Sequence, residues 1–146
     1  MNPSLINWED VFSLAKGYRM PLEKKRAIVR EYLQCQWLGL LYRQKKSEHL
    51  RFIGGTSLRI LRGLDRFSED LDFDNLGLTS NELEELLEKS VREFELIGLE
   101  PRFTFKGIKM CTWRAEFLFE NGMLESIGAS EHEDEKLSLQ FNATTP

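Results

Sequence analysis

Two aspartates at alternate positions, Asp70 and Asp72, are the residues best placed to do chemistry. They lie in the segment Glu69 to Asp74, where acidic and apolar residues alternate, and this alternation predicts a half-buried strand. In a strand, residues two apart project from the same face, about 7 Å apart along the chain. Two carboxylates so placed repel each other unless a cation lies between them. Mg²⁺ (or Mn²⁺) suits them, because Mg²⁺ takes one or two carboxylates together with substrate phosphates.

An exposed acidic edge strand without a ligand is the alternative to an ion site. A calcium-binding loop fits this segment less well. Asn75 stands where such a loop needs a turn glycine, and Asn81 stands where it needs a bidentate glutamate.

A glycine-containing turn precedes the two aspartates. It consists of Gly54, Gly55, Thr56 and Ser57, between a predicted strand at Leu50 to Ile53 and a predicted helix at Ser57 to Leu64. Glycine lets a phosphate approach the backbone, and the helix N-terminus and hydroxyls offer hydrogen-bond donors to an anion. The turn has the spacing of neither a Walker A loop nor a dinucleotide-binding fingerprint. A plain strand-to-helix turn is the alternative interpretation.

Three arginines at helical spacing, Arg59, Arg62 and Arg66, lie between the glycines and the aspartates. Residues three and four apart share one face of a helix, and cations near a metal site assist phosphate recognition. For each arginine alone, a solvated helix face is the simpler interpretation. Together, the turn, the arginines and the aspartates predict a site that holds a metal-bound triphosphate for phosphoryl or nucleotidyl transfer.

The rest of the sequence predicts the elements that position this site. A long helix is indicated by an apolar stripe, which Gln36 interrupts, made of Val29, Tyr32, Leu33, Trp37, Leu40 and Leu41. Thr79 and Glu82 form a capping box that begins another helix, which ends near Gly98. A short helix is also expected over Trp8 to Ala15.

Strands dominate the sequence after Gly98. Apolar and polar residues alternate around Phe103 and Phe105, from Trp113 to Phe119, and from Leu137 to Phe141, in a last strand expected to run nearly to the end of the chain. Asn121-Gly122 is a hairpin turn signal, and the acidic run Glu131 to Glu135 is typical of a solvated loop. This order predicts an α+β fold (an α/β sandwich), in which helices pack against a small mixed sheet.

Length, charge and cysteine content limit the class of protein. The 146 residues predict one domain over 1–146, and a net charge of −4 excludes a protein that is basic throughout and wraps nucleic acid. Cys35 and Cys111 match no ligand pattern, so we expect free thiols that are buried or half-buried. The sequence lacks a signal-peptide pattern, and the uncharged stretch Tyr32 to Tyr42 is too short to span a membrane. We therefore expect a soluble cytoplasmic protein.

One long run of residues is similar to a known family. The run Phe52-Ile53-Gly54-Gly55-Thr56-Ser57-Leu58-Arg59-Ile60-Leu61 continues through Gly63-Leu64 to Arg66-Phe67-Ser68-Glu69-Asp70-Leu71-Asp72-Phe73. It resembles the AbiEii/AbiGii-type nucleotidyltransferases of the DNA polymerase β-like superfamily, which read apolar-Gly-Gly-Thr, an apolar/arginine helix, and Arg-x-Ser-x-Asp-x-Asp-Phe. The upstream segment Arg30 to Gln34 and the tail segment Lys136 to Leu139 also resemble the family, so the similarity covers residues 20–146.

The resemblance implies a nucleotidyltransferase-fold core, a metal-bound nucleoside triphosphate and transfer of a nucleotide to an acceptor such as RNA. It also implies the toxin of a bacterial toxin–antitoxin or phage-defence pair, with a cognate antitoxin as partner. By position, it assigns phosphate binding to Gly54, Gly55 and Thr56, metal binding to Asp70 and Asp72, and support of the turn to Arg66 and Ser68. We therefore expect Asp70 and Asp72 to be the catalytic, metal-binding residues, and the nucleotide-binding residues to be Gly54, Gly55, Thr56, Ser57, Arg59, Arg66 and Ser68.

The chain departs from the family at a third acidic position. In the family this acid lies on a late strand, after a lysine and an apolar position; the chain has Gln140 in place of the lysine and Asn142 or Thr144 in place of the acid. A third carboxylate helps to activate the attacking hydroxyl, by holding metal or accepting a proton. The amide of Asn142 could offer an oxygen to a metal, and Glu116 or Glu120 is a candidate replacement for the acid.

The chain also ends at Pro146, where the family continues into a helical C-terminal region. We therefore expect a single nucleotidyltransferase-like domain without that region. Two hypotheses follow. The first is a metal-dependent nucleotidyltransferase, and the second is a truncated or degenerate non-catalytic domain of the same fold that binds nucleotide, RNA or an antitoxin.

Overall fold

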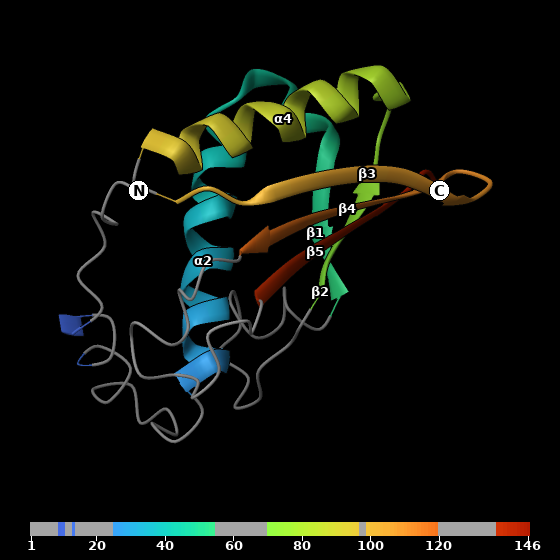
Figure 1. The fold of residues 1–146 in the computed structure, drawn as a ribbon. Helices are drawn as coiled ribbons and strands as arrows, with labels where there is room; N and C mark the ends of the chain where they lie inside the picture. The colour runs from blue at the N-terminus through green and yellow to red at the C-terminus, as the bar shows by residue number, and fades with distance from the viewer. Residues whose placement is uncertain (1–8, 11–12, 14–24, 55–69, 97–98, 120–136) are drawn as a thin grey trace.

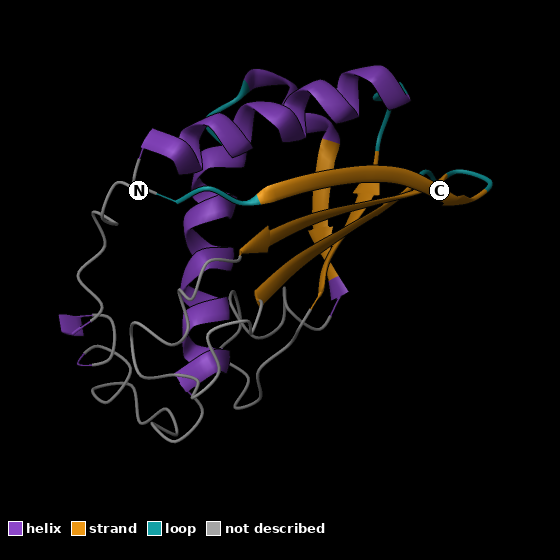
Figure 2. Ribbon diagram, viewed as in Figure 1, coloured by secondary structure: helices purple, strands orange, loops and turns teal. Residues whose placement is uncertain are grey.

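A sheet of five strands forms the centre of the described fold. The computed structural model describes residues 9–10, 13, 25–54, 70–96, 99–119 and 137–146. The elements within these residues are α2 (Lys25–Leu41), η1 (Lys45–His49, a 3₁₀ helix), β1 (Leu50–Ile53), β2 (Asp70–Asn75), α4 (Ser80–Leu96), β3 (Arg102–Lys109), β4 (Thr112–Phe119) and β5 (Leu137–Thr144). Figure 1 and Figure 2 show the strands as one twisted sheet with the two long helices beside it. The predicted α+β fold is confirmed.

The sheet is mixed, as predicted, and its strand order is β1-β2-β5-β4-β3. Neighbouring strands pair antiparallel except for β2 and β5, which are parallel. The parallel pairing places Asp72 directly opposite Asn142, 70 residues further along the chain. Two segments far apart in sequence therefore meet at the centre of the sheet.

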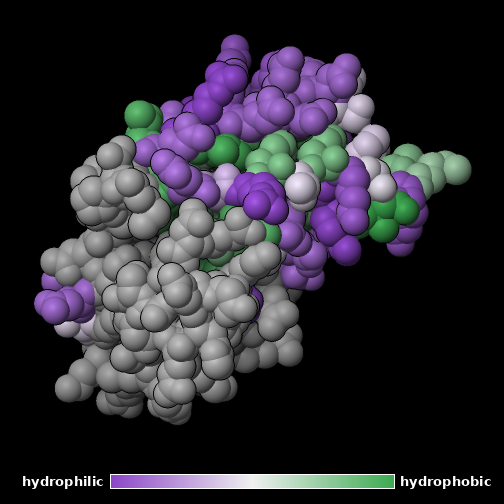
Figure 3. Space-filling model, in the orientation of Figure 1, coloured by the Kyte–Doolittle hydropathy of each residue, from purple (hydrophilic) through white to green (hydrophobic). Residues whose placement is uncertain are grey.

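The core lies between the sheet and the two helices, which contact each other. Trp37 of α2 is fully buried, and its ring centroid lies 6.0, 5.4 and 5.6 Å from those of Phe73, Phe117 and Phe141. Its indole Nε1 donates a hydrogen bond of 2.8 Å to Oγ of Ser90 on α4. Aromatic burial of this kind dominates core energetics, so Trp37 holds both helices on one face of the sheet. The outward surface of α4 is hydrophilic (Figure 3).

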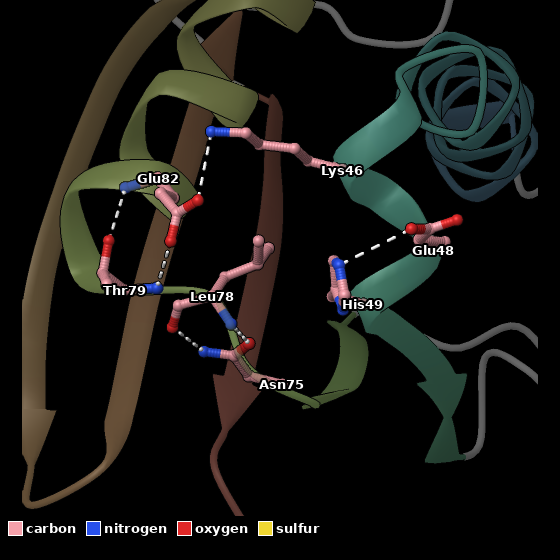
Figure 4. A network of polar contacts seen from close by, with 7 residues as sticks. All are labelled: Lys46, Glu48, His49, Asn75, Leu78, Thr79 and Glu82. Carbon is pink, nitrogen blue, oxygen red and sulfur yellow. Dashed lines mark hydrogen bonds and ion pairs between the residues drawn. The ribbon is translucent and has the colours of Figure 1, made fainter.

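The predicted capping box begins α4. The amide of Thr79 donates to Oε1 of Glu82 at 3.1 Å, and the amide of Glu82 donates to Oγ1 of Thr79 at 3.2 Å. Lys46 of η1 lies 3.1 Å from the same carboxylate (Figure 4). These contacts, first the backbone hydrogen bond from Thr79 and then Lys46, hold the pKa of Glu82 below its ordinary value.

The short connection from β2 to α4 is closed by Asn75. Its side-chain amide donates to the carbonyl of Leu78 and accepts from the amide of Leu78, both at 2.9 Å (Figure 4). Both partners are buried, so these bonds satisfy backbone groups that water does not reach. Asn75, whose presence in place of a turn glycine disfavours a calcium-binding loop, therefore has a structural role at the end of β2.

The buried face of α2 differs from its prediction at several positions, since Ile28 and Gln34 are also buried and Tyr32 and Leu40 are only half-buried. Val29, Leu33, Trp37 and Leu41 are fully buried, four residues apart. Gln36 is exposed, so it does not interrupt the stripe, and the prediction that it does is wrong. A stripe that advances by four residues leaves Gln36 outside its arc.

Both cysteines are free, as expected, but both are exposed, so the expectation that they are buried or half-buried is wrong. Cys35 lies on the solvent side of α2. Cys111 lies in the tight turn between β3 and β4, where its backbone has φ of 63°. Residues at the tip of a hairpin have few neighbours to cover them.

Several predictions fall outside the described residues. They are most of the helix over Trp8 to Ala15, the helix over Ser57 to Leu64, the stop at Gly98, the Asn121-Gly122 turn and the acidic run Glu131 to Glu135. β5 begins at Leu137 and stays paired with β4 as far as Thr144, so the prediction of a last strand that runs nearly to the end of the chain is confirmed. Among the described helices, none has the length and apolar character that crossing a membrane requires.

Candidate active site

Asp70 and Asp72 project from the same face of β2, as the alternation predicts. Both are half-buried, whereas Leu71 and Phe73 are each 1% exposed and lie in the core. β2 lies between β1 and β5, so the alternative of an exposed acidic edge strand is wrong. The two carboxylates are therefore held by a strand that is paired on both sides and anchored by its apolar residues.

Gly54 brings the end of β1 against one of these carboxylates. Its backbone turns with φ of 83°, directly after Ile53, which lies opposite Asp72 in the sheet. A Cβ atom at Gly54 would lie 2.8 Å from Oδ2 of Asp72 and 3.2 Å from its Cβ. Only glycine adopts this conformation at no steric cost and leaves room for such an approach. The glycine bend and the Asp72 carboxylate therefore meet, as the sequence predicts.

A second polar contact reaches Asp72 from the other side of β2. Nδ2 of Asn142 donates to Oδ1 of Asp72 at 3.1 Å, and Nε of Arg114 donates to Oδ1 of Asn142 at 2.9 Å. Arginine is only a donor, so it fixes the orientation of the Asn142 amide. The amide oxygen of Asn142 therefore accepts from Arg114, and the amide NH₂ group faces Asp72.

Asp74, the next acidic residue of β2, has its own partner. Its Oδ2 lies 3.2 Å from Nη2 of Arg51, the residue opposite it on β1. On its other side lies Thr144, whose hydroxyl lies 3.2 Å from that of Thr112. The charge of Asp74 is therefore balanced within the sheet.

Glu116 does not complete a set of three carboxylates. It lies opposite Gln140, which in turn lies opposite Asp70, so two strand spacings, about 10 Å, separate the backbones of Glu116 and Asp70. Within the part of the chain that the structure describes, no group of three His, Cys, Asp or Glu residues is placed to hold a metal ion. Glu120, the other candidate, lies outside the described residues.

The donor set on β2 nevertheless fits one hard cation. Two carboxylates on one face, beside a bend that a side chain would fill, match an ion that keeps several waters and shares the phosphates of its substrate. The other predicted nucleotide-binding residues, Gly55, Thr56, Ser57, Arg59, Arg66 and Ser68, lie outside the described residues.

Sequence reasoning missed Arg114, which the fold brings to the site. The signal was present in the alternation of Thr112 to Phe119, which puts Arg114 and Glu116 on the face opposite Ala115 and Phe117. What the alternation could not give is the pairing partner, since Arg114 reaches Asp72 only through a residue of another strand.

Comparison with known proteins identifies the family. A family model described as nucleotidyl transferase AbiEii toxin, type IV TA system, matches residues 39–139. These residues include β1, Gly54 and both candidate aspartates of β2, and they make up more than half of the chain. A comparison with curated proteins found no match. The chain belongs to the AbiEii nucleotidyl transferase toxin family of type IV toxin–antitoxin systems.

Proposed function

We propose that this protein is a metal-dependent nucleotidyltransferase that transfers a nucleotide from a nucleoside triphosphate to an acceptor such as RNA. The observation that carries the proposal is the contact of the Gly54 bend with the Asp72 carboxylate, on the face from which Asp70 also projects. Such a site offers phosphates close access to the backbone and offers a hard cation its preferred oxygen ligands. Membership of the AbiEii family supports the same class of reaction.

In the proposed reaction, Asp70 and Asp72 hold Mg²⁺ (or Mn²⁺) and are the catalytic residues. The proposed phosphate-binding segment is Gly54, Gly55, Thr56 and Ser57, with Arg59, Arg66 and Ser68 supporting it. The bound ion supplies charge neutralisation for the triphosphate. An acceptor hydroxyl attacks the α-phosphorus, and the bond from this phosphorus to the α–β bridging oxygen breaks. Pyrophosphate leaves, and the proton of the hydroxyl passes to solvent.

The toxin role of the family extends this proposal to partners. Modification of RNA would stop translation in the cell that makes the protein, which is the effect expected of a toxin and of a phage-defence factor. We place this activity in the cytoplasm, where nucleoside triphosphates and RNA occur, and under the control of a cognate antitoxin. The family description supports this role, because it names a type IV toxin–antitoxin system.

A non-catalytic domain of the same fold is the second candidate, and Asn142 favours it. This residue lies directly opposite Asp72, where a carboxylate could help to activate the acceptor hydroxyl. An amide carries no charge and does not act as a base. In that case the protein binds nucleotide, RNA or an antitoxin without turnover.

Transfer of label from nucleoside triphosphates to total tRNA in the presence of Mg²⁺ tests the proposal. The wild-type protein is expected to label RNA, and Asp72→Ala or removal of Mg²⁺ by a chelator is expected to abolish the label. Asp74→Ala is the matched control, because Asp74 shares the strand and face of Asp72 but pairs with Arg51. A wild-type protein that does not label RNA, but whose melting temperature rises with Mg²⁺ and nucleotide, supports the second candidate. No transfer and no rise contradict nucleotide binding altogether.

A further inference from the structure

We infer that Arg114 and Asn142 occupy the position at which a third metal-binding carboxylate would lie. The site therefore holds one divalent ion with its nucleotide rather than two. The inference rests on the proposed function, since it concerns the ion that accompanies the nucleotide. It assigns a positioning role to a pair of residues on β4 and β5 that acts on Asp72 by hydrogen bonding.

The register of the sheet places Asn142 beside the proposed ion ligand. Asn142 lies opposite Asp72 on the parallel strand β5, and Arg114 lies opposite Asn142 on β4, so the three side chains form one row across the sheet. Side chains opposite each other on neighbouring strands share a face and have Cβ atoms about 5 Å apart. A carboxylate at position 142 could therefore share cations with Asp72, as clustered carboxylates do in two-metal sites.

The orientation of the Asn142 amide removes that possibility. Arginine has no acceptor, so its Nε must donate, and the amide must turn its oxygen to Arg114 and its NH₂ group to Asp72. The row therefore presents hydrogen atoms, and behind them the positive charge of a guanidinium, on the β5 side of Asp72. Both features disfavour a cation on that side.

The two oxygens of Asp72 consequently have different neighbours. Oδ1 accepts from Asn142 on the β5 side, whereas Oδ2 faces Gly54 on the β1 side. The Gly54 side is the one that a nucleotide-bound ion can use. Two-metal clamps need carboxylate oxygens on both sides, so among the described residues this site provides for one ion and lacks the ligands for a second.

Equilibrium dialysis with Mn²⁺ and a non-hydrolysable nucleoside triphosphate analogue at equal concentration in both chambers measures the number of ions bound per chain. The wild-type protein is expected to bind about one ion, as a mononuclear carboxylate site does. The double variant Arg114→Gln/Asn142→Asp replaces the amide with a carboxylate and removes the guanidinium, and it is expected to bind about two.

The matched control adds the carboxylate elsewhere on the same strand. In Arg114→Gln/Thr144→Asp the new acid lies opposite Asp74 instead of Asp72, and we expect the number of bound ions to stay at the wild-type value. Two ions bound to the wild-type protein would overturn the inference and leave the proposed function standing. A single ion in the Asn142→Asp double variant would also overturn it. A wild-type protein that binds neither ion nor analogue would instead refute the proposed function.

Discussion

The carboxylate of Asp72 contacts the backbone of Gly54 so closely that a Cβ atom on Gly54 would lie 2.8 Å from its Oδ2. Gly54 directly follows the last residue of β1, and Asp72 lies in the middle of β2. The antiparallel pairing of β1 with β2 brings the two residues together. A side chain at Gly54 would therefore collide with the Asp72 carboxylate. The contact therefore links the glycine signal of the sequence to the acidic one.

Gly54→Ala is expected to destabilise the protein by about 1–3 kcal/mol, since a side chain is strained at φ of 83° and collides with Asp72. Urea unfolding measures this loss. Gly39→Ala in α2 is the control, because a Cβ there meets nothing within 4 Å. It is expected to stabilise by about 0.5–1 kcal/mol, as alanine is the better helix former. Equal effects of the two substitutions would show that the close approach at Gly54 has no energetic consequence.

Asp72→Asn is expected to abolish the rise in melting temperature that Mg²⁺ and a nucleoside triphosphate give the wild-type protein. The physical reason is the loss of one of two anionic ligands, while the amide keeps the size of the side chain. Asp74→Asn removes an ion pair with Arg51 that is worth at most about 1 kcal/mol at a partly exposed site, and it should keep the rise. Differential scanning fluorimetry compares the two. If only Asp74→Asn lost the rise in melting temperature, the assignment of the ion to Asp70 and Asp72 would be wrong.

Ser90→Ala is expected to cost about 1–3 kcal/mol, because it leaves the buried indole N–H of Trp37 without its acceptor. The measurement is the free energy of unfolding in urea. Trp37→Phe and the double variant complete a double-mutant cycle. Ser90→Ala should cost much less in the Trp37→Phe background, and strict additivity of the two substitutions would contradict the hydrogen bond.

The capping carboxylate of Glu82 gives the stability a defined pH dependence. Its pKa in the folded protein is lowered, so the stability that it contributes is present above the unfolded pKa and is lost as pH falls through the folded pKa. The difference in unfolding free energy between wild type and Glu82→Gln should therefore be largest near neutral pH and disappear well below 4.5. A difference that grows on acidification would reverse the sign and contradict the capping role.

Local patterns were sufficient for the elements and for one half of the site. The alternation of Asp70 to Asp74 predicts which face carries the acids, and the spacing of Thr79 and Glu82 predicts the capping box that the structure contains. These features depend on residues within a few positions of one another. The same holds for Gly54, which follows directly from the strand that pairs with β2.

The row across the sheet could not be predicted, because it depends on pairing between distant strands. Arg114 and Asn142 each belong to an alternating segment, but nothing local states that β5 lies parallel to β2 and between β2 and β4. The predicted burial of Cys111 was wrong for a similar reason, because a tight hairpin turn holds this residue away from the core. Contacts of this kind arise from tertiary packing and not from propensity.

Paramagnetic broadening of backbone amide signals by Mn²⁺, in the presence of a non-hydrolysable nucleoside triphosphate analogue, locates the bound ion most directly. The proposed site predicts that the signals of Gly54 and Asp72 broaden first, that those of α4 on the opposite face of the sheet broaden less, and that Asp72→Asn abolishes the effect. Sharp signals from Gly54 and Asp72 while other amides broaden, or an unchanged pattern in Asp72→Asn, would contradict an ion–nucleotide site at this bend.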